Sequence, residues 1–87
     1  MFHVYILRCS DGALYVGSSE DLDTRIATHK SGSAALFTRR RRPVVIVYSE
    51  AHPTRTSAVS GERQIKRWTR AKKEALVAGD RLLLKRL

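Results

Sequence analysis

Two short apolar segments, each carrying a tyrosine and joined by Ser10-Asp11-Gly12, constrain the fold of this chain more than any other feature. Segments 2–9 and 13–17 have the length and the β-branched and aromatic content of strands, and Ser-Asp-Gly is typical of a hairpin loop. The first strand carries Tyr5 and the second carries Tyr15. Side chains alternate between the two faces of a strand, so the loop decides whether both tyrosines can serve one site.

Two loop lengths are compatible with this sequence. A two-residue Asp11-Gly12 turn would pair Tyr5 with Ser18 and place the phenols of Tyr5 and Tyr15 on opposite faces of the sheet. A three-residue loop, with Gly12 in the left-handed bulge position, would pair Tyr5 with Gly17 and place both phenols on one face. The remaining face would hold an aliphatic set suited to a core, which by itself favours neither loop: Phe2, Val4, Ile6, Leu14 and Val16.

The composition indicates one small folded domain that covers residues 1–87. Hydrophobic residues are 43% of the chain and charged residues 29%, which fits a folded domain better than a disordered tail. No apolar run approaches ~20 residues and the N-terminus lacks a signal-peptide pattern, so we expect a cytoplasmic protein with no membrane span. The single cysteine, Cys9, cannot form an internal disulfide and is expected to pack in a strand.

The net charge of +9, from 17 Lys and Arg against 8 Asp and Glu, predicts a polyanionic partner. Charge alone fits nucleic acid, acidic lipid or ribosomal RNA. The run of four arginines before Pro43 has the alternative interpretation of a solvated, self-repelling loop. The residues expected to bind nucleic acid are this run and basic positions on the wetter helix faces: Arg39, Arg40, Arg41, Arg42, Arg63, Lys66, Arg67 and Arg70.

Two helices are expected to carry functional side chains. The first should begin at Ser18, with Asp21 completing a capping box, and should end at Gly32. Arg25 and His29 lie one turn apart on it and share a face.

The second, from about 54 to 68, places Glu62 on or beside an apolar stripe formed by Val59 and Ile65. A lone carboxylate there is costly to desolvate without a cation or hydrogen-bond donors. Gly61 in the helix interior suggests the close approach of another backbone.

The remaining segments complete a small domain. The β-branched run 44–48 is expected to form a third strand, placed centrally or against a helix. Thr69 can cap a helix over 70–78 that Gly79 ends. The leucine-rich, basic tail 80–87 is expected to close over the core.

In order and spacing, Tyr5, Tyr15, Arg25, His29 and Glu62 resemble the GIY-YIG endonuclease superfamily, and in particular its small stand-alone members. The resemblance covers nearly the whole chain. Arg25 and His29 match the Arg-x3-His helix of the family, and Glu62 matches its metal-binding glutamate. Further stretches that resemble the small members are R-C-S-D-G, H-K-S-G, Y-S-E-A-H-P and E-R-Q-I-K-R-W.

The two name-giving motifs are both altered in this chain. The first is present as His3-Val4-Tyr5, without its glycine, and the second as Tyr15-Val16-Gly17, with valine for isoleucine. Some relatives have a lysine where this chain has Ser18 and Ser19, and a late active-site asparagine has no counterpart that we can place. Both tyrosines and the glutamate are retained.

The resemblance implies an α/β (α+β) fold with a small, mainly antiparallel three-stranded sheet flanked by helices. It also implies a divalent-metal-dependent endonuclease that hydrolyses phosphodiester bonds in nucleic acid, expected to be DNA, in repair, recombination or processing. By resemblance Glu62 would bind one Mg²⁺ or Mn²⁺, and Arg25 would clamp the phosphate. Tyr5 would be the general base, while Tyr15 and His29 would orient water or relay its proton. An ordinary phenol has a pKa near 10, so it needs nearby cations to ionise at neutral pH.

Two other function classes remain open. One is a catalytically silent nucleic-acid-binding module with the same fold, and the other, supported by charge alone, is a ribosome-associated or protein-interaction domain. With no separate recognition domain, selectivity would come from the basic surface, DNA shape or a protein partner. A shared site requires the three-residue loop, with a positive φ at Gly12 and both phenols beside Arg25.

Overall fold

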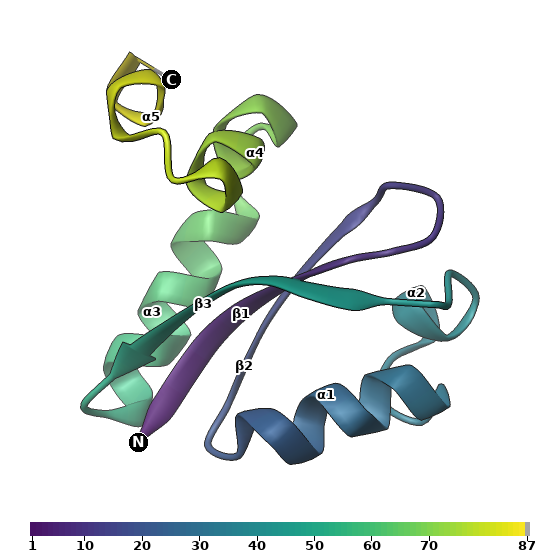
Figure 1. The fold of residues 1–87 in the computed structure, drawn as a ribbon. Coiled ribbons are helices and arrows are strands. Elements are labelled where there is room, and N and C mark those ends of the chain that lie inside the picture. Colours follow the sequence, from purple (N-terminus) through teal and green to yellow (C-terminus); the bar gives the residue numbers. More distant parts are fainter. Residues whose placement is uncertain (87) are drawn as a thin grey trace.

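The computed structural model describes residues 1–86 and is built around a three-stranded sheet (Figure 1). The strand order is β2-β1-β3, and both pairings are antiparallel. The strands are β1 (Phe2–Arg8), β2 (Leu14–Ser19) and β3 (Val45–His52). The predicted α+β architecture is confirmed, with the first strand at the centre of the sheet.

Helices cover both faces of this sheet (Figure 1). Between β2 and β3 the chain forms α1 (Leu22–Ser31) and the short α2 (Leu36–Arg39), which lie on one side. After β3, α3 (Arg55–Lys66) packs on the other side, followed by α4 (Arg70–Ala78) and α5 (Arg81–Arg86). No helix within residues 1–86 is both long enough and apolar enough to cross a membrane.

The β1–β2 hairpin has the three-residue loop. The Cys9 N–H donates to the carbonyl of Ala13, the Gly12 N–H donates to the carbonyl of Cys9, and Gly12 has a φ of 86°. Tyr5 therefore pairs with Gly17. The two-residue turn is excluded, and the two phenols share one face of the sheet.

The central strand separates two cores because its side chains alternate between the faces. Toward α3, the predicted aliphatic face is confirmed: Val4, Ile6 and Val16 pack against Ala58 and Ile65. The second core, on the opposite side of the sheet, has a buried part made of Tyr5, Leu7, Cys9 and Val44, against which Leu22 and Ile26 of α1 pack.

The predicted start of α1 was wrong. Its N-cap is Asp21, whose carboxylate accepts from the Thr24 N–H, and Gly32 ends the helix with a φ of 84° as expected. Ser18 stays in β2 opposite Val4, and its hydroxyl donates to Glu62 instead of capping a helix. A strand register and a side-chain acceptor therefore override the local capping pattern.

The third strand is longer than predicted and lies at the sheet edge, so its predicted central placement is wrong, whereas its predicted packing against a helix is confirmed by its contacts with α3 and α4. Gly61 faces side chains, not a backbone, since a methyl group there would lie 3.3 Å from the His52 ring. The tail prediction was also wrong for the described residues. None of Arg81–Arg86 is buried, because the chain turns away from the sheet after Gly79 (Figure 1). Leu87 lies outside the described residues.

Candidate active site

A buried chain of three side chains links β1, α1 and α2. The Tyr5 hydroxyl lies 2.8 Å from His29 Nε2, and His29 Nδ1 lies 2.8 Å from Thr38 Oγ1. All three side chains are at most 1% exposed. The Thr38 hydroxyl in turn donates to the carbonyl of Ala35 at 3.2 Å. A buried polar group requires such a partner, and here each finds one.

These partners assign the tautomer of His29. Because Thr38 uses its own proton on Ala35, its oxygen accepts from the His29 Nδ1–H. His29 Nε2 is then the acceptor and Tyr5 is the donor. Burial, and to a lesser extent the charge of Arg25, lowers the pKa of His29 below its ordinary value, which favours this neutral form. His29 is therefore placed to receive the proton of Tyr5.

The Tyr5 phenol also lies directly against the backbone of β2. A methyl group added at Gly17 would lie 2.5 Å from the Tyr5 hydroxyl oxygen and 2.7 Å from Cζ. Only glycine leaves room for the phenol at this position. Tyr15 packs beside it, with its ring centroid 6.4 Å from that of Tyr5 and 4.9 Å from that of His29.

Arg25 is the exposed cation of the group. It lies one turn before His29 on α1 and lines a pocket together with Ser18. Burial, followed by the negative charge that an ionised Tyr15 would carry, raises the pKa of Tyr5, while the charge of Arg25 lowers it. The net shift is upward, so Tyr5 stays protonated unless further positive charge approaches.

Glu62 projects from α3 toward the end of β2. Its Oε1 accepts from the Ser18 hydroxyl at 2.5 Å, and its Oε2 lies 2.7 Å from Lys66 Nζ. Burial raises the pKa of Glu62, but the hydrogen bonds from Lys66 and Ser18 and the charges of Lys66 and Arg63 together bring it below the ordinary value. The side chain is therefore an ionised carboxylate, 20% exposed.

The donor set at Glu62 fits a hard divalent ion held by one carboxylate. Among residues 1–86 no group of three or more His, Cys, Asp or Glu side chains could enclose a metal. Mg²⁺ commonly binds through one or two carboxylates and completes its shell with water and phosphate oxygens, so Glu62 alone is chemically sufficient. The ammonium of Lys66, whose side chain is 51% exposed, lies against Glu62 Oε2 and shows that a cation is favoured at this oxygen.

The predicted nucleic-acid-binding residues fall into two groups. Four of them are exposed, and within the described chain their side chains make neither an ion pair nor a hydrogen bond: Arg39, Arg40, Arg63 and Arg67. The others already have partners inside the protein. Arg41 pairs with Asp11 at 3.0 Å and stacks on Phe37, while Arg70 donates to the carbonyl of Gly12 and also pairs with Glu74.

Arg42 donates to the carbonyls of Arg39 and Ser31, and Lys66 pairs with Glu62. Arg41 and Arg70 thus hold the hairpin loop from two sides, and Arg42 ties the arginine run to the end of α1. The arginine run is in part a structural element, which neither interpretation of its sequence anticipated.

The fold and this side-chain group agree with known proteins. A profile of the GIY-YIG catalytic domain matches residues 1–75. The chain belongs to the GIY-YIG family. GIY-YIG domains are nuclease domains that act on nucleic acid and generally use a divalent metal ion.

Its relatives are small proteins of similar length. A UPF0213 protein of Bacillus pumilus is 42% identical over 80 residues, which cover 92% of this chain and 82% of the relative. One of Staphylococcus aureus is 45% identical over 74 residues, covering 85% and 90%. An NMR structure of a UPF0213 protein of Bacillus halodurans has a TM-score of 0.60 at 42% identity, covering 92% of this chain and 86% of that one. An NMR structure of an E. faecalis protein gives 0.61 at 33% identity, covering 92% and 85%.

Within this GIY-YIG domain Tyr5, Tyr15 and His29 pack against one another. Arg25 and Glu62 lie on either side of Ser18, since Arg25 lines a pocket with Ser18 and the Ser18 hydroxyl donates to Glu62. Sequence reasoning missed Thr38, the partner of His29, and the contact of Ser18 with Glu62. No sequence signal marked Thr38, which lies in a short polar segment. Gly17 did carry a signal, because it is the last residue of the second motif.

Proposed function

We propose that this protein is a divalent-metal-dependent endonuclease that hydrolyses phosphodiester bonds in DNA. The observation that carries the proposal is the buried Tyr5–His29–Thr38 hydrogen-bond chain beside Arg25 and the ionised Glu62. Hydrolysis of a phosphodiester requires activated water, neutralisation of the phosphate and help for the departing oxygen. The site has one candidate for each requirement.

Tyr5 and His29 would act together as the base. As water loses a proton to the Tyr5 oxygen, the Tyr5 proton passes to His29 Nε2, so the charge moves onto a ring that Thr38 holds through Nδ1. Tyr15 would orient the water from the same face of the sheet. Arg25, exposed at the pocket, would hold the phosphate and favour the phenolate.

Glu62 would hold Mg²⁺ or Mn²⁺ together with water and phosphate oxygens. When bound, the ion supplies positive charge for the pentacovalent phosphate and the departing oxygen. Lys66 must then leave Glu62 Oε2, which its exposed, flexible side chain allows. The released ammonium would be available to a phosphate.

One observation favours a second candidate, a catalytically silent nucleic-acid-binding module. Glu62 already has Lys66 and Ser18 as partners, so a structural role would satisfy it without a metal. In that case Glu62→Gln should lower thermal stability, and the unmodified protein should bind DNA without cleaving it. The two candidates therefore differ in activity and in stability.

The test uses Glu62→Gln and Tyr5→Phe, each with a matched control. Asp23→Asn makes the same carboxylate-to-amide change at an exposed position, and Tyr48→Phe removes a phenol whose hydrogen bond to Glu50 lies on the edge strand. Labelled single-stranded, duplex, flap and RNA substrates are incubated with Mg²⁺, Mn²⁺ or EDTA. Thermal stability and affinity are measured on the same preparations.

We expect Glu62→Gln and Tyr5→Phe to lower cleavage by orders of magnitude while affinity stays similar, and both controls to cleave normally. Removing a transition-state interaction typically costs about 10²–10³-fold in rate. A fully active Glu62→Gln protein would refute the metal role. A folded parent that binds DNA but cleaves nothing with either ion would favour the silent module.

A further inference from the structure

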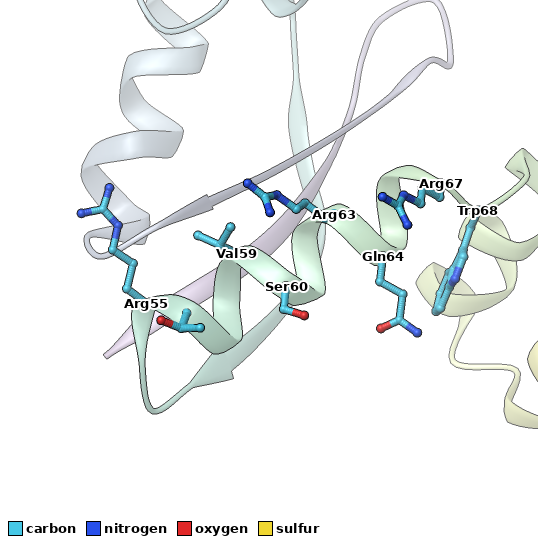
Figure 2. Close-up of a pocket in the computed structure, with 8 residues that line it drawn as sticks. Arg55, Val59, Ser60, Arg63, Gln64, Arg67 and Trp68 are labelled. Atoms are coloured by element: carbon cyan, nitrogen blue, oxygen red, sulfur yellow. The ribbon is translucent and has the colours of Figure 1, made fainter.

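A pocket beside the candidate active site, which Arg25 alone of the five site residues lines, adjoins a second groove along α3. The first pocket is lined by Ser18 and Arg25, and it shares Arg55 and Val59 with a groove of about 700 Å³ that runs to Trp68. Figure 2 shows Arg55 extending from the first turn of α3 toward α1. The two hollows are therefore adjacent, and Arg55 lies at their junction.

The groove has a row of arginines on one face of a helix. The spacing is i, i+8, i+12 for Arg55, Arg63 and Arg67, and Val59 occupies the i+4 position between them. Figure 2 shows the three arginines one after another along α3. At about 1.5 Å per residue the row spans roughly 18 Å. Within residues 1–86 no carboxylate lies within ion-pair distance of these three guanidinium groups, unlike those of Arg8 and Arg41. Unpaired cations in a row fit a chain of phosphates.

The far end of the groove is aromatic. Trp68 is half-buried, lines the groove, and has Lys72 over its ring at 4.3 Å. A positively charged groove that contains an aromatic ring is the arrangement found in single-strand sites, where bases are free to stack on the ring. Bases within a duplex are stacked on one another and do not offer a free face.

We propose that a single DNA strand passes from the active site through the pocket lined by Arg25, crosses Arg55 and Val59, and follows α3, with its phosphates on Arg55, Arg63 and Arg67 and a base against Trp68. This inference rests on the proposed nuclease function for the position of the scissile bond. It adds Arg55 and Trp68 to the binding surface and assigns that surface to unpaired DNA.

The experiment measures binding in EDTA, so that it does not depend on cleavage. Trp68 is the only tryptophan of the chain, which makes intrinsic fluorescence a direct report on the end of the groove. The probes are an oligothymidylate of about 12 nucleotides, within the roughly 4–16 nucleotides that single-strand sites cover, and a blunt duplex of the same length. Arg55→Ser/Arg63→Ser/Arg67→Ser is compared with Arg81→Ser/Lys85→Ser/Arg86→Ser, which removes the same charge from exposed positions of α5.

We expect oligothymidylate, but not the duplex, to quench Trp68. We also expect the groove variant to reduce the slope of log affinity against log salt by about 2, because each of the three lost phosphate contacts contributes roughly 0.7 to that slope. The α5 variant should change the slope little. Oligothymidylate that binds without quenching, equal quenching by the duplex, or the same slope in both variants would overturn the inference. An inactive parent with these binding results would overturn the nuclease proposal and leave the groove as a binding site.

Discussion

Gly17 is the residue at which the packing of the site is tightest. It has no positive φ, so alanine is compatible with its backbone, but a methyl group would lie 2.5 Å from the Tyr5 hydroxyl oxygen. That phenol cannot retreat, because it is buried and hydrogen-bonded to His29. The contact explains in physical terms why a glycine ends the second motif.

We predict that Gly17→Ala costs about 1–3 kcal/mol by overpacking, and that it costs less when Tyr5 is phenylalanine. Removing the hydroxyl eliminates the nearer of the two contacts, so the two changes should not be additive. The four proteins of this double-mutant cycle are compared by denaturant unfolding. Equal costs in both backgrounds would show that the phenol oxygen does not fill the space beside Gly17.

At the level of single residues, the sequence predicted which side chains belong together but not how they are bonded. Tyr5, His29 and Glu62 could be selected because their order and spacing follow a family pattern. Their partners, Thr38 and Ser18, could not. Each partner bond joins two different elements, across 9 residues for Thr38 and 44 residues for Ser18. Each also involves a hydroxyl whose local sequence indicates something else, a polar loop for Thr38 and a helix cap for Ser18.

At the level of elements, local signals with a fixed backbone requirement were reliable, while signals that depend on packing were not. Gly12, Gly32 and Gly79 each have the positive φ that their place at a turn or helix end demands. The position of β3 at the sheet edge results from its pairing with the edge of β1 that β2 leaves free. An apolar run such as 44–48 carries no information about that choice.

The arginine run 39–42 divides into a structural pair and an exposed pair. Arg41 lies 4.0 Å over the Phe37 ring and pairs with Asp11, and Arg42 donates to two backbone carbonyls. The side chains of Arg39 and Arg40 are exposed and make no ion pair or hydrogen bond within the described residues. We predict that Arg39→Ser/Arg40→Ser weakens DNA binding and flattens its salt dependence without changing the melting temperature. Arg41→Ser/Arg42→Ser should lower the melting temperature.

Thermal melts and salt titrations of these two double variants form a matched comparison, since each loses two charges from adjacent positions. Metal-dependent turnover at saturating DNA should survive in the exposed-pair variant, because neither residue contacts the site. An unchanged salt slope in that variant would remove Arg39 and Arg40 from the binding surface. An unchanged melting temperature in the Arg41→Ser/Arg42→Ser variant would show that the contacts of Arg41 and Arg42 do not stabilise the loop.

For the whole molecule, the sequence predicted the aliphatic core face from the alternation of apolar residues along the hairpin strands, but it did not predict the second core and it misplaced the C-terminal tail. A leucine-rich tail suggests burial, yet Leu82 is 67% exposed and Leu83 is 43% exposed. Leu76 and Val77 of α4 already pack against the α3-side core. Helix α4, and not the segment after Gly79, therefore supplies the apolar residues that cover this core.

Because α5 has no buried residue, the domain should fold without it. The family profile ends at residue 75 and none of Arg81–Arg86 is buried, so we expect the C-terminal segment to contribute little to the stability of the folded domain. We predict that a chain ending at Gly79 keeps the melting temperature of the full chain within a few degrees and retains metal-dependent cleavage at saturating DNA. Its affinity at low salt should fall modestly, because the removed segment carries more basic than acidic residues.

Thermal unfolding of the full chain and of the chain ending at Gly79, measured side by side, tests this prediction. A loss of about 10 °C or more, equivalent to roughly 1–3 kcal/mol for a domain of this size, would mean that α5 stabilises α4 and belongs to the folded unit.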